Sequence, residues 1–255
     1  MQWNPETYNQ FKSLRFKPFF DLAALISLEA GTTAIDLGCG TGEQTALLAE
    51  RFPESHFLGI DSSSEMLKNA SQLETGRLQF KLASTEEAIS ADVKWDLIFS
   101  NAALQWSDNH PELFPKIISR LNKNGQLAVQ MPYQPENILN QLLSEIANEE
   151  PFRTYLKDWS RPSTVLTIDA YTQLLFAQGL EELNISQRVY PIVANDYDIL
   201  FEFISGSALI PYLARLDLKQ QALFTSRFKV RIQESFPKLP AIYPFKRLLL
   251  YGKKA

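Results

Sequence analysis

The feature that most restricts the fold of this chain is a glycine-rich turn, Asp36-Leu-Gly-Cys-Gly-Thr-Gly42. A short apolar run, 33–37, leads into the turn, and a helical pattern that stops at Pro53 follows it. Glycines let the backbone adopt positive φ and approach a ligand closely. Because open α/β sheets bind ligands where their strands end, the turn predicts a binding site at the end of a buried strand.

The alternation of strands and helices continues beyond the turn. Further strands are predicted at 56–60, 78–82, 95–100, 125–131, 180–189 and 248–251, most of them separated by helical patterns. Such alternation is typical of βαβ units and a parallel sheet. We therefore expect an α/β fold with a doubly wound, mostly parallel, seven-stranded sheet. Helical content rises after Met131, which predicts a helical insertion in the second half.

Two acidic residues near the turn indicate which kind of ligand it binds. Glu43 occupies the position at which a dinucleotide-binding turn has its third glycine, beside the expected phosphate. A carboxylate there repels phosphate, which favours a nucleoside cofactor without phosphates. Asp61 ends the second predicted strand, where a carboxylate can accept hydrogen bonds from both ribose hydroxyls. The alternative role of Asp61 is to cap the following helix.

Composition excludes several classes of partner. The net charge is −4 and there is no strong basic run, so no nucleic-acid partner is expected. No apolar run approaches the ~18 residues of a membrane span, so no membrane association is expected. Cys39 is the only cysteine, which fits a reducing, cytoplasmic location. Two histidines and one cysteine are too few and too scattered to predict a metal site.

The D-x-G-x-G-x-G turn, with an acid at the end of the second strand, resembles the class I methyltransferases that use S-adenosylmethionine (SAM). The resemblance covers about the first half of the chain. It implies that the glycine turn holds the methionine part of SAM and that the acid holds the ribose. By this resemblance the cofactor-binding residues of the turn and second strand are Asp36, Gly38, Cys39, Gly40 and Asp61.

The same resemblance places Ser62 and Met66 beside the adenine. The third strand of the family usually supplies an aspartate to the adenine amino group. Here the matching stretch, 83–85, has no acid, and Ser84 is expected to substitute.

Other segments resemble the trans-aconitate 2-methyltransferase family more closely, which methylates one carboxylate of a small tricarboxylic acid. They are 3–11, 96–106, 110–115 and 125–132. The N-A-x-L-Q-W pattern within 101–106 also occurs in malonyl-carrier-protein methyltransferases of biotin synthesis. The resemblance implies further cofactor contacts by Tyr8, Asn101, Ala102, Gln105 and Trp106. It implies substrate contacts by Trp106, His110, Tyr133, Tyr212 and Arg247, whereas Ile210 stands where the family commonly has arginine.

The resemblance also suggests four ranges. They are a helical cap over the cofactor at 1–30, a SAM-binding domain at 31–190, a helical lid at 191–243 and a last strand at 244–255. The expected activity is methyl transfer to a carboxylate of a small acid, with S-adenosylhomocysteine as the second product. Two alternatives remain open: methylation of a carrier-bound malonyl group, and SAM binding without catalysis. The sequence does not determine the oligomeric state, and a monomer is compatible with it.

Overall fold

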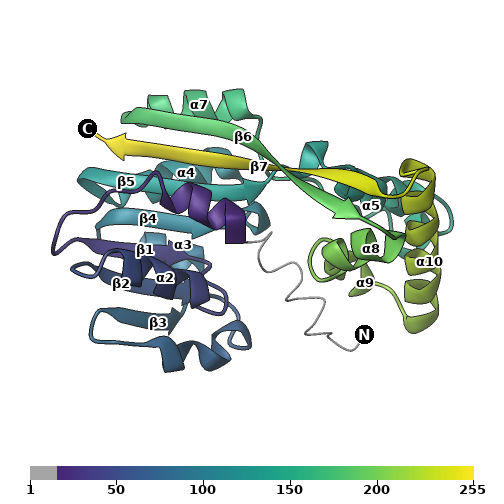
Figure 1. Cartoon of the computed structure of the whole chain (residues 1–255), viewed down its shortest axis with the longest axis horizontal. Helices are drawn as coiled ribbons and strands as arrows, with labels where there is room; N and C mark the ends of the chain where they lie inside the picture. Colours follow the sequence, from purple (N-terminus) through teal and green to yellow (C-terminus); the bar gives the residue numbers. More distant parts are fainter. Residues whose placement is uncertain (1–15) are drawn as a thin grey trace. The chain divides into compact units, whose positions relative to one another are not determined.

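A computed structural model of the chain describes residues 16–255, and these fall into two compact units (Figure 1). The sheet unit comprises residues 16–132, 164–188 and 247–255. The helical unit comprises, among described residues, 133–163 and 189–246. Residues 133–163 thus group with the later helices, although the sequence analysis included them in the range 31–190. The reason is that their apolar side chains share a core with those helices.

The sheet has seven strands in the order β3-β2-β1-β4-β5-β7-β6. They are β1 (Thr33–Leu37), β2 (His56–Asp61), β3 (Leu78–Leu82), β4 (Trp95–Asn101), β5 (Leu121–Pro132), β6 (Leu180–Ala194) and β7 (Ala241–Lys254). Strands β1 to β5 pair in parallel, and β7 pairs antiparallel with β5. The doubly wound, mostly parallel α/β fold expected from the sequence is therefore confirmed.

Helices of the sheet unit lie between its strands along the chain. They are α2 (Glu43–Arg51), η1 (Met66–Leu73), α3 (Thr85–Ser90), η2 (Leu104–Trp106), α4 (His110–Ser119) and α7 (Ile168–Ala177). Residues 16–23 are also helical, and Phe19 packs edge-on against Phe99 of β4 with ring centroids 5.9 Å apart. Leu48 of α2 belongs to the same buried cluster. These contacts bury one face of the sheet and so hold the strand ends in place.

The helical unit is built on its own apolar core. Its helices are η3 (Gln134–Glu136), α5 (Ile138–Asn148), α6 (Phe152–Tyr155), α8 (Tyr197–Ser205), α9 (Ile210–Leu213) and α10 (Leu218–Ser235). Phe224 and Phe228 of α10 are fully buried. Asp217 caps α10 by accepting the N–H groups of Lys219 and Gln220. Local capping and a shared core therefore define this unit.

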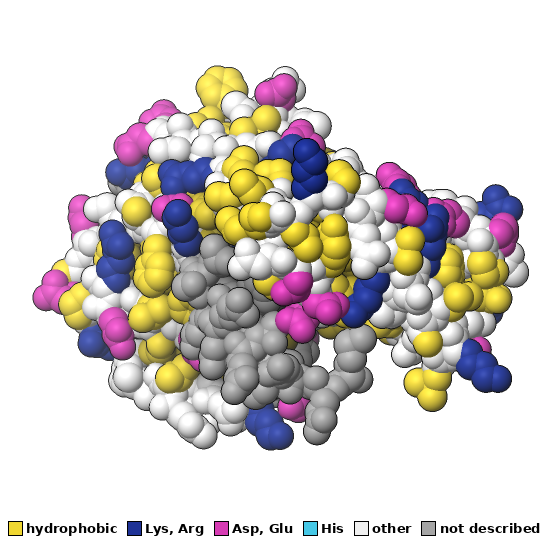
Figure 2. All heavy atoms as spheres, turned by 45° about the vertical axis from the view of Figure 1, so that its right-hand side comes forward, with side chains coloured by type: hydrophobic (Ala, Val, Ile, Leu, Met, Phe, Trp, Pro, Cys, Tyr) yellow, Lys and Arg dark blue, Asp and Glu magenta, His cyan; other side chains and the backbone are white. Residues whose placement is uncertain are grey.

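Charged side chains of both signs are mixed on the face of the molecule drawn in Figure 2. Lys and Arg lie scattered among Asp and Glu there. Among residues 16–255, no helix is both long and apolar enough to cross a lipid bilayer.

Candidate cofactor and acceptor site

The glycine-rich turn follows β1 and uses the conformations that only glycine adopts freely. Gly38, Gly40 and Gly42 have φ of 79°, 58° and 80°. A Cβ on Gly38 would collide with the Cβ of Ala103, whereas no described residue beyond its chain neighbours lies within 4 Å of a Cβ built on Gly40. The turn therefore packs tightly on one side and leaves open space for a ligand at Gly40.

Asp61, at the end of β2, holds this turn in place. Its Oδ2 accepts the Gly40 N–H at 2.9 Å, and its Oδ1 accepts the Ser63 N–H at 2.8 Å. The carboxylate thus organises both the turn and the loop after β2. A carboxylate has about four acceptor positions, so lone pairs remain for the hydroxyls of a ribose.

Two groups beneath the turn are shielded from water. Burial raises the pKa of the Asp36 carboxyl to about 7, although the Thr45 hydroxyl donates to it at 2.6 Å. Burial, and then the nearby Asp36 and Asp61, raise the pKa of the Cys39 thiol. Cys39 therefore stays a neutral thiol at physiological pH, as expected for a small residue that packs within the turn.

The end of β4 provides polar atoms beside the turn. Asn101 donates from Nδ2 to Gln44 Oε1 of α2 at 2.8 Å, and its Oδ1 is buried without a hydrogen-bond partner among the described residues. Gln105 donates from Nε2 to the Ala102 carbonyl at 2.6 Å, and its Oε1 is likewise buried without a partner. Ala102 has a φ of 57°, a strained value for a non-glycine residue that is frequent at functional sites. Two buried acceptors here call for donors from a ligand.

The residues expected near the adenine are accessible but have structural roles as well. Ser62 and Met66 are exposed after β2. Ser84 caps α3: its hydroxyl accepts the Glu87 N–H at 3.1 Å, while its own N–H donates to the Glu87 carboxylate at 2.7 Å. One hydroxyl proton of Ser84 remains able to contact a ligand.

His110 is part of the core of the sheet unit. Its ring is fully buried, with Nδ1 hydrogen-bonded to the Tyr171 hydroxyl and Nε2 to the Leu104 carbonyl at 2.9 Å. Burial lowers the pKa of the imidazole, so it is neutral at physiological pH. Both nitrogens are engaged within the sheet unit, and contact of His110 with the acceptor stays a prediction. Trp106, in contrast, is 41% exposed on η2.

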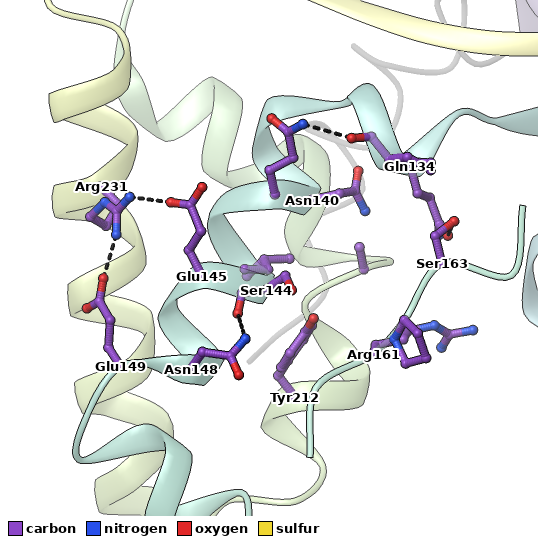
Figure 3. Close-up of a pocket in the computed structure, with 15 residues that line it drawn as sticks. Gln134, Asn140, Ser144, Glu145, Asn148, Glu149, Arg161, Ser163, Tyr212 and Arg231 are labelled. Carbon is purple, nitrogen blue, oxygen red and sulfur yellow. Dashed lines mark hydrogen bonds and ion pairs between the residues drawn. The ribbon is translucent and has the colours of Figure 1, made fainter. Parts of the chain in front are cut away.

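Three tyrosines of the predicted site do not belong to the described sheet unit. Tyr8 lies outside the described residues. Tyr133 is buried at the start of the helical unit, where its N–H donates to the Lys246 carbonyl at 2.9 Å. Tyr212 stacks on Phe224 and lines a cavity of about 810 Å³ within the helical unit. Figure 3 shows Tyr212 and Arg161 on one side of this cavity, with the ion pairs of Arg231 on the other.

Arg247 lies on β7 in the sheet unit, opposite Pro132 of β5. Only 5% of its surface is exposed, so the surface role that competed with substrate binding is excluded. A buried guanidinium keeps its charge and offers a planar pair of donors. Its burial makes Arg247 a candidate partner for an anionic acceptor.

Comparison with known proteins identifies the family to which this chain belongs. A family model described as a methyltransferase domain matches residues 28–194. The chain belongs to the class I SAM-dependent methyltransferases. A trans-aconitate 2-methyltransferase of Deinococcus radiodurans is 40% identical over 100% of this chain and 99% of its own. The enzyme of that name from Variovorax paradoxus is 31% identical over 93% of this chain and 91% of its own.

Solved structures with low sequence identity share the fold of this methyltransferase. YcgJ of Bacillus subtilis has a TM-score of 0.59 at 16% identity, covering 93% of this chain and 98% of its own. Phosphoethanolamine N-methyltransferase 2 of Haemonchus contortus, solved with SAM, has a TM-score of 0.56 at 16% identity, covering 93% and 52%. The cofactor of the enzyme is SAM. The open space at Gly40 and the buried acceptors of Asn101 and Gln105 fit a cationic nucleoside ligand.

Sequence reasoning missed three polar residues near these features. Gln44 orients Asn101, Arg161 lies beside Tyr212 in the helical unit, and Gln130 of β5 is fully buried. Only Gln130 carried a local signal, because an amide interrupts the apolar run of 127–131. Gln44 and Arg161 come close to their partners only through the fold, so sequence spacing could not reveal them.

Proposed function

We propose that this methyltransferase transfers the methyl group of SAM to a carboxylate of a small polycarboxylic acid such as trans-aconitate. The observation that carries the proposal is the sequence identity of 40%, over the full chain, with an enzyme named for that reaction. The aligned region includes both compact units, so the residues that contact an acceptor fall within it.

The buried Arg247 supports an anionic acceptor. The guanidinium is 5% exposed, and a carboxylate matches its planar pair of donors. Ile210 differs from the arginine common in the family, and it is exposed on α9. We infer that Arg247 contributes a charge for acceptor binding which Ile210 does not.

The chemistry needs orientation more than proton transfer. Bound SAM supplies an electrophilic methyl group on a sulfonium. A carboxylic acid has an unperturbed pKa near ~4, so the acceptor is already ionised at neutral pH. Its oxygen can attack the methyl carbon while the carbon–sulfur bond breaks, and no proton has to be removed. The residues of the site therefore act by aligning the acceptor and excluding water. The engaged nitrogens of His110 agree with a reaction that uses no general base.

The cofactor contacts are assigned on the same basis. We infer that Asp61 accepts the ribose hydroxyls and that the buried acceptors of Asn101 and Gln105 receive the ammonium of the methionine part. Ser62, Met66 and Ser84 then lie toward the adenine. We infer a cytoplasmic location, which the single, buried Cys39 fits because it needs no oxidising compartment.

A carrier-bound malonyl group is the competing acceptor. An enzyme that docks an acidic carrier protein needs a basic surface. The net charge of −4 and the mixed charges on the face in Figure 2 give such docking no support.

The proposal is tested by measuring S-adenosylhomocysteine release from purified enzyme and SAM. Trans-aconitate, cis-aconitate, citrate and malonyl-carrier protein serve as separate acceptors. We expect turnover with trans-aconitate and much less with the other three. Turnover with the carrier alone would move the enzyme to the competing assignment. SAM binding without turnover on any of them would refute the proposed acceptor and leave the cofactor assignment intact.

A further inference from the structure

A second buried polar side chain lies on the strand next to Asn101. Gln130 of β5 lies directly opposite Asn101 of β4 in the parallel pairing. Side chains alternate between the faces of a strand, and Ala128 packs into the cluster that contains Phe99 and Leu249. Gln130 therefore projects from the same face of the sheet as Asn101.

The amide of Gln130 has no hydrogen-bond partner at either end. The residue is 0% exposed, and within residues 16–255 neither Nε2 nor Oε1 has a partner. An unpaired buried polar group destabilises the folded state relative to a paired one. Buried groups of this kind are rare and need an explanation, of which an absent ligand is one.

The neighbours of Gln130 form a polar row across three adjacent strands. In the antiparallel pairing of β5 with β7, Pro132 opposes Arg247 and Gln130 opposes Leu249. Arg247 is thus the diagonal neighbour of Gln130, at a separation that long side chains can bridge. Asn101, Gln130 and Arg247 share one face near the carboxyl ends of β4 and β5. Ligands of α/β sheets bind at this edge.

Another buried amide on the same strand shows what a structural role looks like. Gln126 lies four residues earlier on the same face. Its Oε1 accepts the Ser27 N–H at 3.1 Å and the Tyr251 hydroxyl at 3.0 Å, and its Nε2 donates to the Ser27 carbonyl. Gln126 is therefore fully paired, whereas Gln130 is kept unpaired in the same kind of environment.

We propose that Gln130 is a specificity-determining residue of the acceptor site and binds a carboxylate of the substrate beside Arg247. The inference rests on the proposed function. An amide N–H adds a donor next to the guanidinium without adding a second positive charge. Since the amide also carries an acceptor, it can take an N–H from a neighbouring donor and so fix its own orientation. A polycarboxylic acid has a second carboxylate to be held in this way, in addition to the one that is methylated.

The two glutamines of β5 provide a matched test. Gln130→Met replaces the amide by an apolar group of similar length, and Gln126→Met makes the same change at the paired site. We expect Gln130→Met to keep or raise the melting temperature, because it removes unpaired buried groups. Its KM for trans-aconitate should rise at least tenfold, about 1.4 kcal/mol, while the Kd for SAM stays within about twofold. Gln126→Met should lower the melting temperature and leave KM within about twofold.

An unchanged KM in Gln130→Met would overturn the inference, and an equal loss of SAM affinity would assign Gln130 to the cofactor instead. If Gln130→Met does not fold, Gln130→Asn is measured in its place. Asparagine is one methylene shorter and moves the amide away from the substrate, so the KM for trans-aconitate must again rise at least tenfold.

A separate binding measurement keeps this inference distinct from the proposed function. The saturated tricarboxylate propane-1,2,3-tricarboxylate is titrated calorimetrically into the S-adenosylhomocysteine complexes of wild type and Gln130→Met. If the wild type fails to methylate trans-aconitate, the proposed function is wrong, yet weaker tricarboxylate binding by the variant still supports the role of Gln130. Equal binding by the two proteins, or binding by neither, overturns that role.

Discussion

The glycine-rich turn of the sheet unit and the helices of the helical unit are held by different physical means. At the turn, positive φ values and the hydrogen bonds that Asp61 accepts from the Gly40 and Ser63 N–H groups fix the backbone. In the helical unit, a large apolar core is joined by ion pairs of Glu149 with Arg227 and Arg231. A single atom added to the turn should therefore abolish ligand binding, whereas a charge removed from the helices should alter stability alone.

The largest effect is expected from Gly38→Ala. The added methyl group collides with the Cβ of Ala103, and alanine disfavours the φ of 79°. We expect SAM affinity to fall at least about a hundredfold, which is about 2.7 kcal/mol. Calorimetric titration with SAM measures this loss.

Gly179→Ala is the matched control for Gly38→Ala. Gly179 has a φ of 75° but no atom within 4 Å of its Cβ position. It should lower stability by about 1–2 kcal/mol and leave SAM affinity unchanged. Equal SAM affinity in the two variants would contradict the tight packing assigned to the turn.

A smaller effect on the same region is expected from Asp61→Ala. The change removes two bonds that hold the turn and its loop, together with the proposed acceptor for the ribose. SAM affinity should fall more than about tenfold, or 1.4 kcal/mol. Titration of SAM into the variant is the measurement, and unaltered affinity would refute the ribose assignment.

Asp96→Ala controls for the loss of a strand-bound acid. Asp96 of β4 accepts the Thr33 N–H at 2.8 Å and an amide proton of Asn122 at 2.7 Å. It lies at the amino end of β4, whereas Asp61 lies at the carboxyl end of β2. Its removal should lower the melting temperature without weakening SAM binding.

The smallest effect is expected from Glu149→Gln in the helical unit. Arg227, and then Arg231, hold the pKa of Glu149 below its ordinary value of 4.5. A depressed carboxyl pKa contributes stability above that ordinary value, and the contribution is lost as pH falls through the folded-state pKa. The glutamate is partly exposed, so the loss at neutral pH should be about 1 kcal/mol or less. Denaturant unfolding between about pH 3 and about pH 7 checks this, because the two proteins should converge at acid pH.

Glu202→Gln removes an exposed carboxylate of α8 and serves as its control. It should leave stability unchanged across this pH range. A loss of SAM affinity in Glu149→Gln would contradict the contrast between the two regions. It would mean that the ion pairs of the helical unit affect ligand binding as well as stability.

The two regions also differ in how far the sequence predicts them. The turn and its flanking strands are determined by neighbouring residues, so glycine spacing and apolar runs predicted β1, β2 and the fold class. The membership of 133–163 in the helical unit depends on contacts with α10, more than fifty residues farther along the chain, and no local pattern encodes it.

The residues of the candidate site also differ in whether the sequence predicts them. Gly38, Gly40 and Asp61 could be named from their motif, because the motif describes backbone geometry. The pairing of His110 with Tyr171 and the isolation of the Gln130 amide could not be foreseen, because hydrogen-bond partners and burial arise from the tertiary fold. Arg247 was ambiguous for that reason until its burial was known.

The place of β7 in the sheet has a consequence for how the protein is made. This strand lies between β5 and β6, although it follows both along the chain. While the nascent chain is still emerging from the ribosome, β6 has no neighbour to pair with, and the exposed edge of β5 is open to wrong partners. The edge strand joins the sheet only after β7 has been translated, and Arg247, the diagonal neighbour of Gln130, arrives with β7. The proposed acceptor site around Arg247 is therefore completed last, after the cofactor turn has already been synthesised.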